Sequence, residues 1–124
     1  DEYGSIKWEP EEFRKLYDRL TSKILLNIDD IVSTESFYLE DAEIVLIAYG
    51  SETRPCKEAV IRARTNKIPV GMLKLNTIWP VPEAQIKQVS ENARVLLSVE
   101  MNIGKYSREI ERVAGNQCEV RRIT

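Results

Sequence analysis

The sequence has 124 residues, of which 43% are hydrophobic and 31% are charged, and its formal net charge is −2. These values are typical of one soluble domain with a hydrophobic core, and the lack of a basic excess argues against nucleic-acid binding. There is no histidine, so the commonest general base near neutral pH and the commonest zinc ligand are missing. No apolar run approaches the roughly 20 residues that a membrane-spanning helix needs.

The two cysteines, Cys56 and Cys118, are far apart in the sequence. Two thiols cannot hold an iron–sulfur cluster, which uses about four, and their spacing does not indicate a disulfide framework. We interpret both as small buried hydrophobic residues and expect a cytoplasmic protein. Because the sequence begins with Asp1 rather than Met, we also expect it to be a fragment of a longer protein.

The first predicted element is a long helix over Pro10–Asp30. Pro10 suits the first helical position, and Trp8 and Phe13 stand at the two positions of a hydrophobic staple. Apolar residues recur at helical spacing along this segment, so the helix has one apolar face that must pack on the following domain or on a neighbour. We therefore divide the chain into a linker and long helix at 1–32 and an α/β domain at 33–124.

The second region alternates predicted strands with predicted helices. The run Ala42–Tyr49 is almost continuously apolar and rich in β-branched residues, which indicates a strand covered on both faces, as in a parallel sheet. Asn102 is a good N-cap and Gly115 a natural helix stop. The predicted strands are 36–40, 42–49, 69–75, 94–99 and 117–123, and the predicted helices are 54–66, 82–90 and 102–114. This alternation predicts βαβ crossovers and an α/β fold.

Ligands of open α/β sheets bind beyond the carboxyl ends of the strands. Here those ends carry Gly50–Thr53, Thr77–Pro80 and Glu100–Gly104, and two of them lead into helix N-termini, which can hold an anion. However, every βα turn needs small residues and a cap, and neither the dinucleotide-binding glycine pattern nor the Walker A pattern is present. We therefore favour a structural role for these turns over an anion site at Ser51–Thr53 or Asn102–Gly104.

Three side chains at these strand ends have two interpretations each. Glu52 and Glu100 fit either acid–base chemistry or structural roles, in which they cap a helix or pair with Arg54 or Arg108. Since no nucleophile, histidine or metal set accompanies them, we favour the structural roles. Trp79, in a proline-stiffened loop, is either a lid on the core or an anchor for a partner.

Three segments together carry a family resemblance: A-Y-G-S-E-T-R at 48–54, N-T-I-W-P-V-P at 76–82 and E-M-N-I-G-K-Y-S-R-E-I-E-R at 100–112. They resemble, in order and in spacing, the C-terminal domain of the α subunit of 2-oxoacid:ferredoxin oxidoreductases, notably the 2-oxoglutarate type. Val81 stands where that family usually has Phe, and Lys105 stands where it usually has Gln.

The resemblance implies a fold like the transketolase C-terminal domain. That fold is a three-layer α/β/α sandwich with a five-stranded, mostly parallel mixed sheet in the order 1-3-2-4-5, in which strand 1 is antiparallel and lies at an edge. It would place the two helix N-termini at one crevice.

The resemblance also implies a parent reaction, in which a 2-oxoacid and coenzyme A give an acyl-CoA, carbon dioxide and reduced ferredoxin. Thiamine diphosphate, magnesium and iron–sulfur clusters do that chemistry in other domains and subunits, so we expect no catalytic, cofactor-binding or metal residue here. The implied role is a scaffold that contacts the other domains and subunits, with ferredoxin and coenzyme A as partners of the parent complex. The candidate crevice or interface residues are Gly50, Ser51, Glu52, Thr53, Arg54, Thr77, Trp79, Pro80, Pro82, Glu100, Asn102 and Gly104.

Two other interpretations remain open at this point. The chain fits the equivalent domain of a transketolase or of a 2-oxoacid dehydrogenase component, and it also fits a stand-alone module that binds an anionic metabolite.

Overall fold

The structure is a computed structural model that describes residues 9–124, and the chain divides into two compact units between Ile31 and Val32. The first unit contains helix α1 (Pro10–Leu25) and the short helix α2 (Ile28–Ile31). The predicted staple partner Trp8 lies outside the described residues. No residue of α1 is buried, and its apolar face remains exposed. None of the described helices combines the length and the apolarity needed to cross a bilayer.

The prediction of one helix as far as Asp30 is wrong, because the helix breaks before Ile28. The cause lies at Asn27. Its backbone N–H donates to the carbonyl of Ile24, only three residues back, and its side-chain amide donates to the carbonyl of Lys23. The side chain therefore takes the carbonyl that the helix would offer to the backbone of residue 27, and the last turn tightens.

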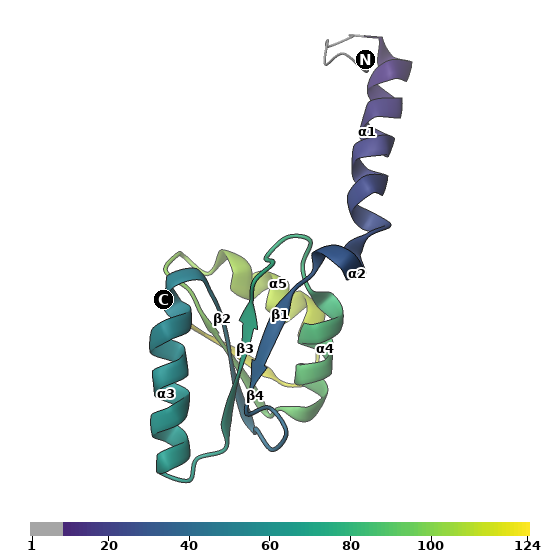
Figure 1. Cartoon of the computed structure of the whole chain (residues 1–124). Coiled ribbons are helices and arrows are strands. Elements are labelled where there is room, and N and C mark those ends of the chain that lie inside the picture. Colours follow the sequence, from purple (N-terminus) through teal and green to yellow (C-terminus); the bar gives the residue numbers. More distant parts are fainter. Residues whose placement is uncertain (1–8) are drawn as a thin grey trace. The chain divides into compact units, whose positions relative to one another are not determined.

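The second unit is built on one five-stranded sheet, shown in Figure 1. Its strand order is β1-β3-β2-β4-β5; β1 runs antiparallel to β3, and the other neighbours are parallel. This confirms the predicted order and the predicted antiparallel edge strand. The strands are β1 (Thr34–Phe37), β2 (Ile44–Tyr49), β3 (Val70–Leu75), β4 (Val95–Val99) and β5 (Glu119–Ile123).

Helices cover both faces of this sheet and complete the predicted three layers (Figure 1). A 3₁₀ turn at Gly50–Glu52 leads into α3 (Thr53–Thr65), which packs on one face with Cys56 and Val60 buried. Helices α4 (Glu83–Asn92) and α5 (Lys105–Ala114) pack on the other face through the buried Ile86 and Ile110. Alternate residues of β2 pack into the hydrophobic cores on the two faces of the sheet, which explains why its sequence is continuously apolar.

Two predicted boundaries need correction. The strand expected at 36–40 is β1 at Thr34–Phe37, and it ends because Tyr38 has a left-handed φ of 53°. The helix expected from Asn102 starts only at Lys105, because Gly104 has a φ of 82°. The remaining elements differ from the predicted ranges by a residue or two at their ends.

Candidate functional site

Glu100 is a buried carboxylate at the carboxyl edge of the sheet, with 2% of its surface exposed. Its Oε2 accepts the backbone N–H of Tyr106 at 3.0 Å, and its Oε1 accepts that of Ser107 at 2.9 Å. Both donors lie in the first turn of α5, where backbone N–H groups have no partner within the helix. Of the structural roles predicted for Glu100, capping a helix is therefore the one observed; its carboxylate forms no ion pair with Arg108 among residues 9–124.

Tyr49, the last residue of β2, extends this cluster. Its hydroxyl donates to Oε2 of Glu100 at 3.4 Å and accepts from the side-chain amide of Asn102 at 3.0 Å. Its ring meets the ring of Tyr106 edge-on, with centroids 5.3 Å apart. The Tyr106 hydroxyl in turn donates to the carbonyl of Ile78 at 3.0 Å. The ends of β2 and β4, the start of α5 and the loop after β3 are thus tied into one unit.

The surroundings shift the pKa values of two groups in this cluster. Burial by itself raises the pKa of Glu100, but the hydrogen bonds from Tyr106 and Ser107 outweigh it and hold that pKa below its usual value. Burial and the neighbouring Glu100 charge raise the pKa of Tyr49 above its usual value. A carboxylate that stays ionised beside a phenol that stays protonated is poorly suited to proton transfer at neutral pH.

The backbone N–H groups of residues 104–107, at the start of α5, all donate to side-chain oxygens of this chain. Besides the two bonds to Glu100, the Oδ1 of Asn102 accepts the backbone N–H of Gly104 and of Lys105, each at 2.9 Å. These side-chain oxygens take the positions that a bound phosphate would occupy. This arrangement supports the structural role that the sequence favoured for the turn at Asn102–Gly104.

The turn at Gly50–Thr53 lies beside the turn at Glu100–Gly104, which is the proximity that the predicted crevice requires. The Ser51 hydroxyl donates to Oε1 of Glu52 at 3.0 Å and lies 3.8 Å from the sulfur of Met101. The Oγ1 of Thr53 is buried and has no hydrogen-bond partner among the described residues. Arg54, at the start of α3, is exposed.

The loop from Thr77 to Pro82 has a buried and an exposed side. Pro80 and Pro82 are buried, and the peptide bond before Pro80 is cis. Thr77 belongs to the β1 side of the sheet, where its hydroxyl accepts the backbone N–H of Ser33 at 3.1 Å. Trp79 is 66% exposed, so it does not act as a lid on the core of this chain.

Trp79 belongs to a set of large apolar side chains that face solvent at the strand ends. The exposed fractions are 45% for Ile78, 66% for Trp79, 83% for Met101 and 78% for Ile103. We call these four residues the strand-end surface. Of these four residues, only Trp79 was singled out from the sequence. For Met101 and Ile103 the sequence offered one signal: two large apolar residues flank Asn102 in a segment that belongs to no periodic strand or helix pattern.

Other residues of the site were also not predicted. Tyr49, Ser98, Tyr106 and Ser107 all contact Glu100 or its partners, and Ser98 lies 3.3 Å from Oε1 of Glu100. Tyr49 offered a signal, because a tyrosine at the end of a buried strand needs a hydrogen-bond partner for its hydroxyl. The sequence could not show that this partner is Glu100, because Glu100 follows a different strand, β4.

The side chains present do not fit an iron–sulfur cluster. Cys56 packs in the core under α3, whereas Cys118 packs against the core under α4 and α5, so the two thiols lie on opposite faces of the sheet. Burial raises the pKa of both thiols, which disfavours the thiolate form that ligates metals. Within residues 9–124, no three His, Cys, Asp or Glu side chains are grouped to hold a metal ion.

A family model described as pyruvate:ferredoxin oxidoreductase core domain II matches residues 42–124. The chain belongs to this family. The match confirms the resemblance that the strand-end segments carry. The family is named for a ferredoxin oxidoreductase, which favours that enzyme class over the transketolase and dehydrogenase alternatives.

Curated relatives of this core domain II chain are subunits of such enzymes. It is 42% identical over 111 residues to the 2-oxoglutarate synthase subunit KorA of Methanothermobacter marburgensis. That alignment covers 90% of this chain and 30% of the relative. It is 35% identical over 111 residues to the ketoisovalerate oxidoreductase subunit VorB of the same organism, covering 90% and 32%. The chain thus spans about a third of the length of these relatives.

A solved structure shares the core domain II fold. The 2-oxoglutarate:ferredoxin oxidoreductase from Magnetococcus marinus, with 2-oxoglutarate, coenzyme A and succinyl-CoA bound, superposes with a TM-score of 0.78. The alignment covers 97% of this chain and 21% of that chain, at 20% sequence identity. At this identity the comparison supports the architecture of the sandwich.

Proposed function

We propose that this chain is the non-catalytic C-terminal domain of the α subunit of a 2-oxoacid:ferredoxin oxidoreductase of the 2-oxoglutarate type. It acts as a scaffold through which the enzyme assembles. The parent enzyme converts a 2-oxoacid and coenzyme A to an acyl-CoA and carbon dioxide and reduces ferredoxin. The names of the curated relatives support the enzyme class, and the greater identity to KorA than to VorB supports 2-oxoglutarate as the substrate.

In this proposal the redox chemistry takes place outside the chain. Thiamine diphosphate, magnesium and iron–sulfur clusters are held by other domains and subunits of a cytoplasmic complex, which also meets ferredoxin and coenzyme A. We also propose that the chain is organised as a first segment at 1–32, which contains the linker and α1, and an α/β domain at 33–124. The separated cysteines and the ionised, fully hydrogen-bonded Glu100 support a structural role for this domain.

The observation that carries the scaffold role is the strand-end surface of Ile78, Trp79, Met101 and Ile103. Apolar side chains of this size gathered at one edge mark contact sites, and tryptophan is enriched among the residues that dominate binding energy. The base beneath them is rigid, because Tyr106 binds the Ile78 carbonyl and Glu100 holds the start of α5. A surface that is already ordered loses little entropy when a partner docks.

Two basic side chains lie next to the apolar residues in the sequence. Lys105 and Arg108 lie one turn apart at the start of α5, directly after the Met101–Gly104 turn, and neither forms an ion pair within the described residues. A partner surface with an apolar centre and acidic residues at its rim matches this pattern.

The test compares assembly with stability in the full-length α subunit. We expect Trp79→Ala to weaken association with the other subunits at least tenfold, because truncation of a central tryptophan typically costs about 2 kcal/mol or more. The free energy of unfolding should change by less than about 0.5 kcal/mol, the range for exposed residues. Ile68→Ala is the matched control, since Ile68 is 45% exposed and precedes β3 at the opposite edge of the sheet. Equal losses in assembly and stability would show that Trp79 serves only the fold.

A second measurement tests whether this chain alone has catalytic activity. The purified chain should show no 2-oxoacid oxidation, even when thiamine diphosphate, magnesium, coenzyme A and ferredoxin are supplied. Measurable turnover by the chain alone would refute the scaffold role.

A further inference from the structure

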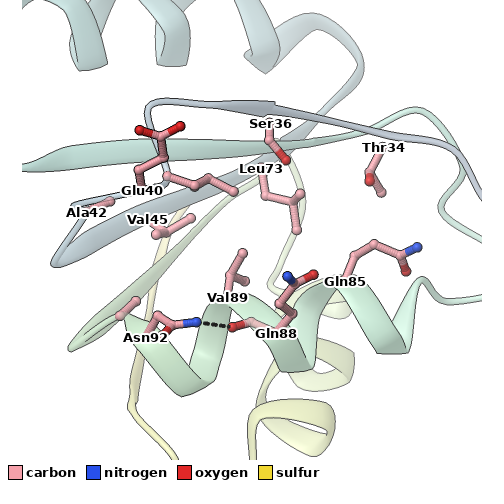
Figure 2. A pocket seen from close by; sticks show the side chains of 12 residues that line it. Thr34, Ser36, Glu40, Ala42, Val45, Leu73, Gln85, Gln88, Val89 and Asn92 are labelled. Carbon is pink, nitrogen blue, oxygen red and sulfur yellow. Dashed lines mark hydrogen bonds between the residues drawn. The ribbon is translucent and has the colours of Figure 1, made fainter.

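A groove of about 390 Å³ lies between edge strand β1 and helix α4, on the side of the sheet opposite α3 (Figure 2). The groove is separate from the strand-end surface, because none of its lining residues belongs to the Glu100 cluster or to the Thr77–Pro82 loop. Its volume falls in the range of sites that bind small ligands or peptide segments.

The floor of the β1–α4 groove is apolar and well packed. Val45 and Leu73 project from the sheet, and Val89 projects from α4, as Figure 2 shows. These three side chains are between 2% and 8% exposed, and the smaller Ala42 and Ala93 complete the floor. Because these residues belong to the main core, the packing of the sheet against α4 fixes the floor of the groove.

The two walls are polar and face each other. Thr34 and Ser36 present hydroxyls from β1, and Gln85 and Gln88 present carboxamides from α4 (Figure 2). None of these four side chains forms a hydrogen bond within residues 9–124. Hydroxyls and carboxamides each offer both donors and acceptors. The groove therefore holds unused hydrogen-bonding capacity on both sides of an apolar floor.

This combination selects an extended peptide over a helix. A helix satisfies its own backbone groups internally and would leave both polar walls without partners. An extended segment presents backbone N–H and C=O groups to both sides at once while its side chains alternate toward and away from the floor. The positions Gln85 to Asn92 span about 10 Å along α4 at ~1.5 Å per residue, which corresponds to about three extended residues.

Charge restricts the occupant further. Glu40, at the rim, is the only ionisable residue in the lining, and no hydrogen bond or ion pair engages its carboxylate within the described residues. A basic side chain that leaves the groove at this end would meet a carboxylate without a partner. An acidic side chain there would be repelled.

We propose that the β1–α4 groove binds an extended peptide segment, contributed by another subunit of the oxidoreductase, with small apolar side chains on the floor and a Lys or Arg beside Glu40. The subunit origin rests on the proposed function; the peptide-binding chemistry does not.

Peptide binding is tested on the ¹⁵N-labelled 124-residue chain by NMR, with acetyl-VAVK-amide as the probe and acetyl-VAVE-amide as its charge-reversed control. The side-chain amide signals of Gln85 and Gln88 should shift with VAVK and reach saturation in the millimolar range, with at least threefold weaker binding of VAVE. No shift of these signals up to about 10 mM peptide would overturn the proposal. Equal binding of the two peptides would overturn the assignment of Glu40.

Two variants localise the response. Ser36→Trp fills the groove and should abolish the VAVK shifts. Glu35→Trp is the matched control, because the neighbouring residue on β1 pairs with Lys74 on the other face of the sheet. Gln88→Leu removes one wall amide from an exposed helix position and should weaken VAVK binding without unfolding the chain. Unchanged binding in both groove variants would place the peptide elsewhere.

The source of the segment is tested in the assembled complex with a photo-crosslinking amino acid at position 88, and with one at the exposed position 91 of α4 as the control. A cross-link from position 88 to another subunit, absent from position 91, supports the proposal. A cross-link only within the same chain, or none, overturns the subunit origin. This readout is independent of the Trp79→Ala assembly test, so either proposal can fail alone.

Discussion

The carboxylate of Glu100 accepts the backbone N–H of Ser107 at 2.9 Å, so the residue that follows β4 caps the helix that comes after it. The same carboxylate binds the backbone N–H of Tyr106, whose hydroxyl reaches the carbonyl of Ile78. A single buried charge thereby fixes the position of α5 and, through Tyr106, the loop that carries Trp79. The strand-end surface depends on this arrangement for its rigidity.

Replacement of Glu100 by Gln should lower the free energy of unfolding by about 2 kcal/mol at pH 7, because two charge-assisted hydrogen bonds to α5 are weakened. The pKa of Glu100 is lower in the folded chain than in the unfolded one, so its stabilisation is complete above the unfolded value, about 4.3. It is lost as the pH falls through the folded pKa. Urea unfolding should therefore show that the wild type and the variant differ less in free energy of unfolding at pH 3 than at pH 7. Glu91→Gln, on the exposed face of α4, is the control.

Tyr106→Phe should loosen the Trp79 loop while it preserves the ring contact with Tyr49. The variant loses only the hydrogen bond to the Ile78 carbonyl, which is worth about 1 kcal/mol. Hydrogen exchange of the amides at 76–79 should become faster, and the exchange of β2 and β3 should not change. Tyr38→Phe removes an exposed hydroxyl outside this cluster and serves as the control. Unaltered loop exchange would show that the proline residues alone hold the loop.

Gly71→Ala should destabilise the chain by about 1–3 kcal/mol, because a Cβ at this position would lie 2.6 Å from the backbone oxygen of Tyr38 and 2.9 Å from the Cβ of Ala42. A backbone atom cannot rotate away as a long side chain can. Chemical denaturation gives the measurement, and Ser36→Ala on the neighbouring strand should stay within about 0.5 kcal/mol of wild type. A neutral Gly71→Ala variant would mean that the segment 38–42 can move away from β3.

The pair of substitutions Lys105→Glu and Arg108→Glu should slow assembly of the full-length subunit by about tenfold at low ionic strength. The effect should fade as salt is added, because exposed charges are screened over about 8 Å at physiological ionic strength. Lys87→Glu, on the exposed side of α4, reverses one charge elsewhere and is compared with Lys105→Glu alone, which makes the same change in net charge. Stopped-flow association rates across a salt series provide the test, and equal slowing by Lys87→Glu would point to net charge rather than to the rim of the strand-end surface.

The strands and helices were predictable where burial dictates the sequence. Ala42–Tyr49 lies between two cores, so every position must be apolar, and this pattern needs no knowledge of the partners. Prediction failed where one residue's local geometry decides the outcome. Tyr38 ends β1 by adopting a left-handed backbone, and Asn27 breaks the first helix with its own side chain. Neither residue type demands that behaviour.

The sequence by itself determined the alternation of strands and helices, and its three strand-end segments indicated the family. It also argued against chemistry that requires histidine or a cluster of thiols, because the chain has no histidine and its two cysteines are far apart in the sequence. Only the tertiary structure decided what the strand-end residues do. It brought Tyr49 and Tyr106 to the Glu100 carboxylate, left Trp79, Met101 and Ile103 exposed at the carboxyl edge of the sheet, and opened a groove beside β1. The physical reason is that hydrogen bonds and burial depend on neighbours that the fold brings together from positions more than 50 residues apart, such as Tyr49 and Glu100.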